Sequence, residues 1–488
     1  MHTFAPTPAV RLRPEHRVYL GLDPHDGYKR VWSKPSDSVG VVGPPRYGKT
    51  SGVIIPALLY WAGPAVSTST RGDILDFCGN WRGRIASGNG GRVYVYDPFE
   101  SEHRATSIRW SPLAECEDPS VCFRRVQAMT AVAGRGLSDG EHWRSGAAMI
   151  LRGLFHAAAL AGDSISEVRR WLARQEVRRP AQTIRAHQSA AEGWADDLEA
   201  VKLLGERERG SFYSVARNCL EATAEPRVLE TCSATDLDVD HFLQTNSTLF
   251  IVGPSHFQDV VAPMIVGLID SIAQRAAELA AAQGGRLARP LLLALDEVAN
   301  IAPLKSLPTL VSEGGGRGII TLWAAQSLAQ LRARYGAEEQ QAILTATTAK
   351  IIYGGMSNDS DLRNISAWAG EHSVPELTFH AAGMDPAFAA PDRLNRPGEW
   401  NSSRAIDGAN PAYGAGGQGG LGSPADAARQ HSIGSSYRPV LPVEVIQQMP
   451  PHNAWLWWQS EPPMQVETRP AGLVPEYRDV SGYTPAGG

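Results

Sequence analysis

The chain has 488 residues, of which 43% are hydrophobic and 20% are charged, so it can bury one or two sizeable cores. This composition excludes a short peptide and a mainly disordered chain. The 46 basic and 51 acidic residues give a formal charge of -5, which excludes a polybasic nucleic-acid binder and leaves room only for local contact with nucleic acid. Arg outnumbers Lys by 40 to 6, which indicates coding bias in a GC-rich genome.

The cysteines and the apolar runs indicate the compartment. The five cysteines are scattered and form no CxxC pair, so neither a disulfide framework nor a zinc site is expected. No window shows the roughly 18 apolar residues of a membrane span, because the longest runs, such as 54–60 and 291–295, have the length of core elements. The N-terminal segment carries Pro and charge where a signal peptide needs an apolar stretch. We therefore expect a cytoplasmic protein without a transmembrane segment.

The pattern of residues 1–96, about the first fifth of the chain, predicts an α/β unit. Residues 1–35 are Pro-rich and predict an extended arm. An apolar run at 38–42, a Gly-containing loop, an apolar helical stretch at 51–61 and a second run at 63–66 together predict a βαβ unit. A further strand is expected at 91–96.

The middle of the chain changes character. From about 118 to 235, helical spacing of Ala, Leu, Arg and Glu predicts an all-helical insert. Strand character returns at 247–252, 290–295, 318–325 and 349–354, with helical stretches after them. The fold class expected is α/β, with a mostly parallel sheet flanked by helices and an inserted all-α domain.

Residues 43–50, Gly-Pro-Pro-Arg-Tyr-Gly-Lys-Thr, fit the pattern GxxxxGK[ST] without a mismatch and stand between a predicted strand and a predicted helix. Backbone N–H groups of such a loop can wrap a phosphate, and the helix that follows presents its positive end. Lys49 would reach the β and γ oxygens, and Thr50 would ligate Mg²⁺. The candidate nucleotide-binding residues are Gly43, Pro44, Pro45, Arg46, Tyr47, Gly48, Lys49, Thr50 and Ser51.

An acidic pair supplies the second half of such a site. The apolar run 291–295 ends in Asp296 and Glu297. Asp296 would hold Mg²⁺, mostly through water, and Glu297 would polarise the attacking water. Adjacent acids can also mark a strand end that runs into solvent, but their pairing with the phosphate loop favours ATP hydrolysis. Neither the NKxD element of a GTPase nor the acceptor site of a kinase is visible in the sequence.

Two further polar residues flank the strand predicted at 318–325. Gln326 follows the strand, which places its amide at the carboxyl edge of the sheet, where it could sense the γ-phosphate; a helix-capping or surface role is the alternative. Arg317 precedes the strand and therefore lies at the opposite edge. It could reach the nucleotide of a neighbouring subunit in a ring, or it could be a solvent-exposed side chain.

These motifs and their neighbours resemble the conjugative coupling proteins of type IV secretion systems, the TraG/TraD family with its TraM recognition region. The resemblance covers roughly residues 35–470. The segments that carry it besides the phosphate loop are 69–73, 93–98, 110–113, 142–144 (His-Trp-Arg), 295–319, 323–331 and 437–451. Their order, with a long helical block between the two nucleotide motifs, is more specific than either motif alone.

The resemblance implies a RecA-like P-loop motor that assembles as a homo-hexameric ring on the inner membrane. It would hydrolyse ATP, with Mg²⁺, to bring relaxase-bound single-stranded DNA to the secretion channel. By the same resemblance the phosphate loop binds nucleotide, Asp296 and Glu297 serve magnesium and hydrolysis, Gln326 is the sensor and Arg317 a candidate finger. The implied partners are single-stranded or double-stranded DNA, relaxosome proteins and channel components, with the helical insert meeting DNA or the relaxosome.

The expected domain organisation follows from these assignments. It comprises an extended arm at 1–35, a first part of the ATPase domain at 36–140, an inserted all-α domain at 141–235, a second part of the ATPase domain at 236–470 with a flexible Gly-rich, Ser-rich insertion at 402–436, and a disordered tail at 471–488.

Two departures from the family pattern qualify the resemblance. Family members usually carry membrane helices before the phosphate loop, whereas the 42 residues before Gly43 form no span. We therefore expect membrane contact to be indirect or through a partner, at the inner face of the cell membrane. The family's Lys-Gly-Glu after the second strand is Arg71-Gly72-Asp73 here.

Two alternative functions stay open: a chromosome-type DNA pump of the FtsK or HerA kind, and a nucleotide-dependent docking platform for secreted proteins. The local DNA contacts are open as well. A basic cluster could bind phosphates or form a solvated helix face; it comprises Arg169, Arg170, Arg174, Arg178, Arg179 and Arg185. Trp455, Trp457 and Trp458 could stack on bases, but their alternation in a late strand favours core packing.

Overall fold

The computed structural model describes residue 12 and residues 15–100, 106–133, 140–379 and 431–482. Its main sheet has 11 strands in the order β2-β1-β13-β12-β9-β3-β8-β7-β4-β6-β5. The strands are β1 (Tyr19–Asp23), β2 (Lys29–Trp32), β3 (Val39–Val42), β4 (Ala65–Ser69), β5 (Val93–Tyr96), β6 (Thr248–Val252), β7 (Leu291–Leu295), β8 (Ile319–Ala325), β9 (Ala349–Tyr353), β12 (Asn453–Trp458) and β13 (Met464–Glu467). The expected strands are thus all present.

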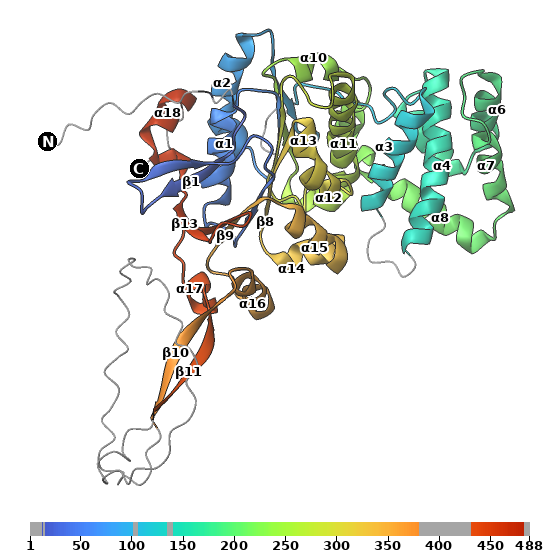
Figure 1. Ribbon diagram of the computed structural model, residues 1–488. Helices are drawn as coiled ribbons and strands as arrows, with labels where there is room; N and C mark the ends of the chain where they lie inside the picture. Colours follow the sequence, from blue (N-terminus) through green and yellow to red (C-terminus); the bar gives the residue numbers. More distant parts are fainter. Residues whose placement is uncertain (1–11, 13–14, 101–105, 134–139, 380–430, 483–488) are drawn as a thin grey trace, which may run out of the picture. The chain divides into compact units, whose positions relative to one another are not determined.

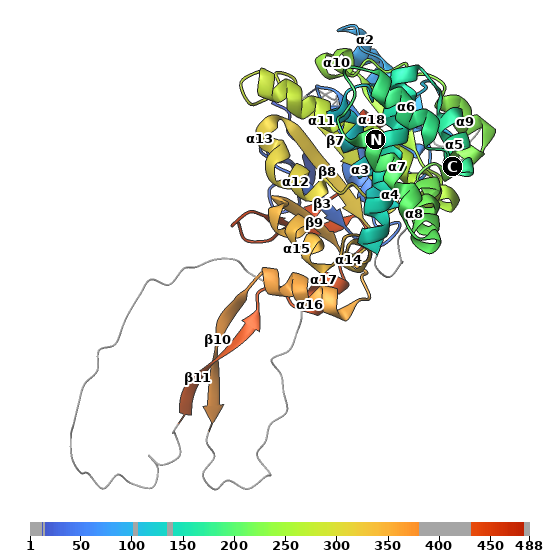
Figure 2. The same cartoon turned by 90° about the vertical axis from the view of Figure 1, so that its right-hand side faces the viewer.

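The strands from β9 to β5 pair in parallel, whereas β12, β13, β1 and β2 extend the sheet by antiparallel pairing. Figure 2 shows β3, β8 and β7 side by side. Every residue of these three strands is buried, as is typical of parallel strands covered by helices on both faces. The mostly parallel α/β fold is confirmed. Parallel pairing also brings the carboxyl ends of β3, β7 and β8 to one edge.

Helices flank the sheet in Figure 1. The helices outside the insert are α1 (Ile55–Tyr60), α2 (Asp73–Ser87), α11 (Gln258–Ala282), α12 (Leu307–Thr309), α13 (Gly315–Arg317), α14 (Leu328–Tyr335), α15 (Ala337–Ala346), α16 (Asp359–Trp368), α17 (Val443–Gln447) and α18 (Pro475–Ser481). Side chains of α1 and α2 form one core with alternate residues of the strands, among them Leu292 and Ile320. The glycine at position 40 in β3 leaves room for Trp323 of β8, whose ring would lie 2.4 Å from a Cβ there.

The helical insert between β5 and β6 consists of α3 to α10, which begin before and end after the bounds 141–235 expected for it. They are α3 (Pro119–Val132), α4 (Gly140–Ala161), α5 (Ile165–Arg174), α6 (Arg178–Ala186), α7 (Trp194–Ala200), α8 (Glu206–Asn218), α9 (Pro226–Thr231) and α10 (Val239–Gln244). Asp118 starts α3 by accepting a hydrogen bond from the Ser120 N–H, and Pro119 fits the first turn. In α5 the residues Ile165, Val168 and Leu172 are buried at helical spacing.

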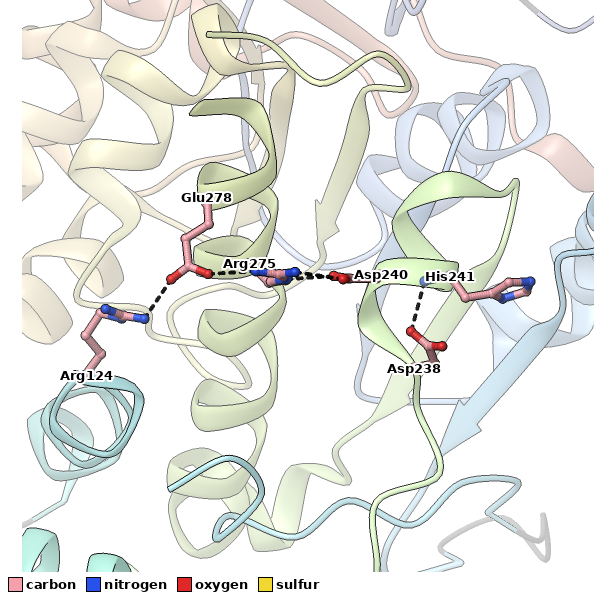
Figure 3. Close-up of polar contacts among 6 residues, drawn as sticks. All are labelled: Arg124, Asp238, Asp240, His241, Arg275 and Glu278. Carbon is pink, nitrogen blue, oxygen red and sulfur yellow. Dashed lines mark hydrogen bonds and ion pairs between the residues drawn. The ribbon is translucent and has the colours of Figure 1, made fainter. Parts of the chain in front are cut away.

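A chain of ion pairs links α3 of the insert to α11 and α10 (Figure 3). Arg124 contacts Glu278 at 2.8 Å, Glu278 contacts Arg275 at 3.2 Å, and Arg275 contacts Asp240 at 2.6 Å. All four side chains are about 40% exposed, so each pair contributes at most about 1 kcal/mol. Apolar packing holds α3 on α11 instead, because Gly267 admits Trp110 and Met129.

Both ends of the described chain depart from the prediction. The arm expected at 1–35 contains β1 and β2, and the tail expected at 471–488 contains α18. The reason is an aromatic cluster: Tyr19 packs on Trp32, Trp32 on Tyr60 of α1, and Tyr60 on Tyr477 of α18. These contacts join segments hundreds of residues apart, which local composition does not reveal.

Helix α11 corrects the expectation that no segment is long and apolar enough to span a membrane. Among the residues that the structure describes, it is the one helix that passes this test by length and composition, with a mean hydropathy of 1.4 over the window. Of that window, 72% is buried inside the protein, as in a core helix.

A second unit comprises residues 366–442, and the first comprises the rest of the chain. The second unit contains the antiparallel hairpin of β10 (Glu371–Phe379) and β11 (His431–Pro439). Most of the insertion predicted at 402–436 lies outside the described residues. Residues 431–436 are described and belong to β11, so the predicted insertion ends earlier than its composition suggested. The other expected domain boundaries stay predictions.

Candidate nucleotide site

The phosphate loop connects β3 to a helix that spans Thr50–Tyr60. Its first turn, Thr50–Ile54, is a wider π-type turn that runs directly into α1. Gly48 has φ +109°, a backbone conformation that favours glycine. A Cβ there would also lie 2.5 Å from the His452 ring. The loop is therefore held in a shape that presents backbone N–H groups at a positive helix end.

Lys49 points into the curve of this loop. Its ammonium donates hydrogen bonds to the carbonyl oxygens of Gly43, at 2.6 Å, and Pro44, at 2.9 Å. The residue is only 7% exposed, and this burial lowers the pKa of the Lys49 ammonium, while the nearby Asp296 and Glu297 carboxylates oppose the shift. A buried cation with neutral oxygen partners suits the oxygens of a phosphate.

Thr50 and Asp296 meet at the sheet edge, although 246 positions separate them. The Thr50 hydroxyl donates to Asp296 Oδ2 at 2.6 Å, and the Thr68 hydroxyl donates to the Asp296 carbonyl at 3.0 Å. A hydroxyl beside a carboxylate is a donor set of hard oxygens, which fits Mg²⁺. Here Thr50 would ligate the ion and Asp296 would hold it, mostly through water.

Burial, more than any neighbouring group, raises the pKa of the Asp296 carboxyl to about 6. The folded pKa lies above the ordinary value of 3.8, so this group contributes stability below pH 4 that is lost as pH rises through 6.

We expect Asp296→Asn to stabilise the metal-free protein, and the gain over wild type should grow by about 1 kcal/mol between pH 5 and 7.5. Urea unfolding with chelator at both values measures it. If the difference in unfolding free energy between variant and wild type were the same at both pH values, burial would not be raising the pKa of Asp296.

Glu297 is held by amide side chains at both carboxylate oxygens. Oε1 accepts from Gln326 Nε2 at 3.0 Å, and Oε2 accepts from Asn300 Nδ2 at 3.2 Å. Gln330 closes the ring, because its Nε2 donates to Asn300 Oδ1 at 2.8 Å and its Oε1 accepts from the Gln326 N–H at 3.0 Å. Glu297 also has φ +50°, a strained backbone typical of functional positions. The ring fixes the direction of the Glu297 carboxylate.

Asn300 and Gln330 are positioning residues that the motifs did not single out. We expect Asn300→Ala to lower kcat for ATP about tenfold with KM unchanged, because Glu297 loses a donor while the nucleotide contacts stay intact. Asn218→Ala, at an exposed helix end, is the matched control. Steady-state ATP turnover measures both. An increase in KM without a change in kcat would show that Asn300 acts on binding instead.

The other predicted positions lie as follows. Gln326 reaches the carboxyl edge beside Glu297, as expected from its place after β8. Arg317 lies before β8, at the opposite edge, and pairs with Glu313 at 3.1 Å, with both side chains about half exposed. Within one chain Arg317 is therefore remote from the phosphate loop, and its role in a ring stays a prediction.

His452 is a third residue that the motifs missed. Its N–H donates to the Tyr47 carbonyl at 3.0 Å, and its ring packs on Gly48. The segment before β12 thus contacts the phosphate loop and stabilises its shape, although it lies about 400 residues further along the chain. The only available signal was that the resembling segment 437–451 ends directly before His452.

Acidic side chains and a backbone carbonyl neutralise most of the basic cluster for which DNA contact and a solvated helix face stayed open. Arg179 pairs with Glu167 and Asp163, and Arg170 also pairs with Glu167. Arg169 donates to a backbone carbonyl, and Arg185 pairs with two acids on α7. Arg174 and Arg178 are exposed. These contacts favour the solvated helix face over a phosphate-binding surface.

The tryptophans of β12 are part of the sheet. Trp457 is 6% exposed, and Trp458 donates to Asp37 at 2.9 Å. Trp455 is half-buried. The geometry favours packing over stacking on bases.

Residues 21–381, about three quarters of the chain, match the family described as Type IV secretory system Conjugative DNA transfer. The chain belongs to this family. The resemblance to TraG/TraD coupling proteins is thereby confirmed.

The conjugal transfer protein TraG of Escherichia coli is 24% identical over 331 residues, which cover 61% of this chain and 49% of TraG. TraG of Agrobacterium fabrum is 22% identical over 69% of this chain and 51% of its own length. The chain spans about half the length of the curated relatives it matches.

The solved structures with the same fold include the plasmid coupling protein TrwB in complex with ADP and Mg²⁺. TrwB is 18% identical, covers 89% of this chain and 85% of its own, and superposes with a TM-score of 0.60. TrwB with the ATP analogue ADPNP gives the same TM-score. At this identity the likeness establishes the RecA-like fold of the family member described here.

Proposed function

We propose that this protein is an ATP-hydrolysing coupling protein that delivers relaxase-bound single-stranded DNA to a type IV secretion channel during conjugation. The observation that carries the proposal is the meeting of Lys49, the Thr50–Asp296 pair and the amide-held Glu297 at one sheet edge. Family membership in conjugative DNA transfer supports the biological setting. That TrwB binds ADP with Mg²⁺ supports the cofactors.

In this proposal each residue has one task. The loop N–H groups and Lys49 bind the β and γ phosphate oxygens, while Thr50 and Asp296 hold Mg²⁺. When bound, the metal neutralises the charge that develops on the phosphates. Glu297 accepts a proton from the attacking water, and Gln326 keeps the Glu297 carboxylate directed at that water.

The assembly belongs to the same proposal. A homo-hexameric ring would bring Arg317 of one subunit toward the nucleotide of its neighbour, because Arg317 lies at the sheet edge opposite its own phosphate loop. The insert would contact DNA or relaxosome proteins. The ring would work at the inner face of the cell membrane through channel components.

ATP turnover with and without DNA tests this function. A single-stranded oligonucleotide should raise the turnover of the purified protein more than a duplex of the same sequence, under conditions where rings form. Stimulation by duplex alone would point to a chromosome-type pump. Turnover indifferent to DNA would instead leave the docking platform, and the motor would be abandoned.

A further inference from the structure

A cleft of about 520 Å³ lies between the insert and the carboxyl edge of the sheet. We call it the insert cleft. One wall comes from α3 and α4, and the other comes from the loop after β7 together with α14 and α15, which Figure 2 shows near α4. Its charged or hydroxyl-bearing lining includes Glu141, Arg144, Lys305, Arg334, Tyr335 and Glu339.

Two residues that line the insert cleft carry buried hydrogen-bond donors that the described residues leave unsatisfied. Arg334 has a side chain only 15% exposed, and its Nε is buried without a hydrogen-bond partner among the described residues. Its ion pair with Asp259 spans 3.5 Å to a side chain that is 90% exposed, so the pair is weak. The Tyr335 hydroxyl is likewise buried without a hydrogen-bond partner in the part of the chain described. Buried donors of this kind favour an acceptor-rich, anionic ligand.

The charge balance of the lining points the same way. Three cations, Arg144, Lys305 and Arg334, face two acids, Glu141 and Glu339. Burial lowers the pKa of the Arg334 guanidinium, so an anion placed beside it would relieve a desolvated charge. This cleft thus differs from the cluster on α5 and α6, where acids neutralise most of the cations.

Arg334 also connects the insert cleft to Glu297. Its Nη2 lies 3.5 Å from the Asn300 carbonyl oxygen, and Gln330, one turn earlier on α14, contacts the Asn300 side chain at 2.8 Å. Asn300 in turn donates to Glu297. A ligand that displaces the Arg334 side chain would therefore shift the hydrogen-bonded ring of Asn300, Gln326 and Gln330, which directs the Glu297 carboxylate.

Two segments that carry the family resemblance converge here. Arg144 ends the His-Trp-Arg segment at 142–144, and Lys305 lies within 295–319. About 160 residues separate them in sequence, yet they line one cleft. Within these segments, the nucleotide site explains the presence of Asp296 and Glu297. It gives no role to Arg144 or Lys305.

We propose that the insert cleft binds a phosphate of the DNA backbone, and that this contact raises ATP turnover by acting through Arg334 on Glu297. The second half rests on the proposed function, whereas the binding half does not. Arg144 and Lys305 would receive the phosphate at the mouth of the cleft, and Arg334 would sense it within.

The test is the double variant Arg144→Gln with Lys305→Gln, which removes two cations and touches neither the phosphate loop nor the amide ring. Arg174→Gln, an exposed cation on α5, is the control. A labelled single-stranded oligonucleotide is titrated at several salt concentrations, and ATP turnover is measured with and without it. The double variant should bind more weakly, with the slope of log K against log salt reduced by about 0.7, the value for one phosphate of single-stranded DNA. Basal turnover should stay within twofold, and stimulation by DNA should be lost.

Unchanged DNA affinity and salt slope in a variant that melts like wild type would overturn the proposal. So would normal DNA binding combined with lost binding of polyglutamate, which would assign the cleft to an acidic protein segment. Retained stimulation despite weakened binding would overturn the coupling to Glu297. If wild type shows no ATP turnover, the proposed function fails, and the salt slope still decides whether the cleft binds DNA.

Discussion

Replacing Glu297 by Gln should lower ATP turnover about 10³-fold while Mg²⁺–nucleotide affinity stays within a few fold of wild type. The reason is that Gln keeps the size and planar shape of the side chain but cannot accept a proton from water, a contribution of about 10² to 10⁴ in rate for a general base. Gln326 and Asn300 each donate to one Glu297 oxygen, so the substituted amide keeps one of these contacts through its oxygen, and the amide on the other side must rotate to accept from its NH₂ group. Fluorescent-nucleotide binding and single-turnover hydrolysis separate the two effects.

Glu192→Gln, at an exposed position of the insert, is the matched control and should leave both quantities unchanged. A Glu297→Gln protein that turned over ATP within tenfold of wild type would remove Glu297 from the chemical step. Equal loss of binding and turnover would mean that Glu297 holds the nucleotide rather than the water.

Lys49→Ala should abolish measurable turnover and weaken nucleotide binding about 10-fold to 100-fold. A hydrogen bond from a charged donor is worth about 1.5–3 kcal/mol, and Lys49 is the cation inside the curve of the phosphate loop. Transition-state charge on the phosphates makes the loss in rate larger than the loss in binding, by about 10² to 10³. The same two assays measure both losses.

The matched control is Lys350→Ala, because burial lowers the pKa of the Lys350 ammonium as it does for Lys49. Lys350 lies in β9 and donates to the Thr347 carbonyl, away from the phosphate loop. Comparable loss in both variants would trace the effect to removal of a buried lysine in general. Preserved turnover in Lys49→Ala would refute the nucleotide site itself.

Short stretches of sequence were enough to predict the features that depend only on residues close together in the chain. The phosphate loop at 43–50 is contiguous, and the buried strands β3, β7 and β8 are short apolar runs bounded by turn residues. Asp296, Glu297 and Gln326 could be placed at one edge because parallel strands share a carboxyl edge. The insert could be recognised from a change in spacing alone.

Contacts between distant segments were beyond such reasoning. The aromatic packing of Tyr19, Trp32, Tyr60 and Tyr477 turned a predicted arm and tail into ordered elements. The neutralisation of Arg179 by Glu167 and Asp163 likewise depended on how α5 and α6 meet the preceding loop. Neither follows from composition, since the same residues in another packing would be exposed.

The sequence by itself determined the fold class, the family and the nucleotide motifs, because each depends on periodicity, on residues adjacent in the chain or on the order of such segments along it. Only the tertiary structure decided that Asn300, itself held by Gln330, contacts Glu297. It also decided that the His452 ring packs on the phosphate loop and that Arg144 and Lys305 line one cleft. The net charge of -5 shows the same division. Charge is summed over the chain, whereas binding depends on which cations folding leaves without acidic partners, and that is set by packing between elements far apart in sequence.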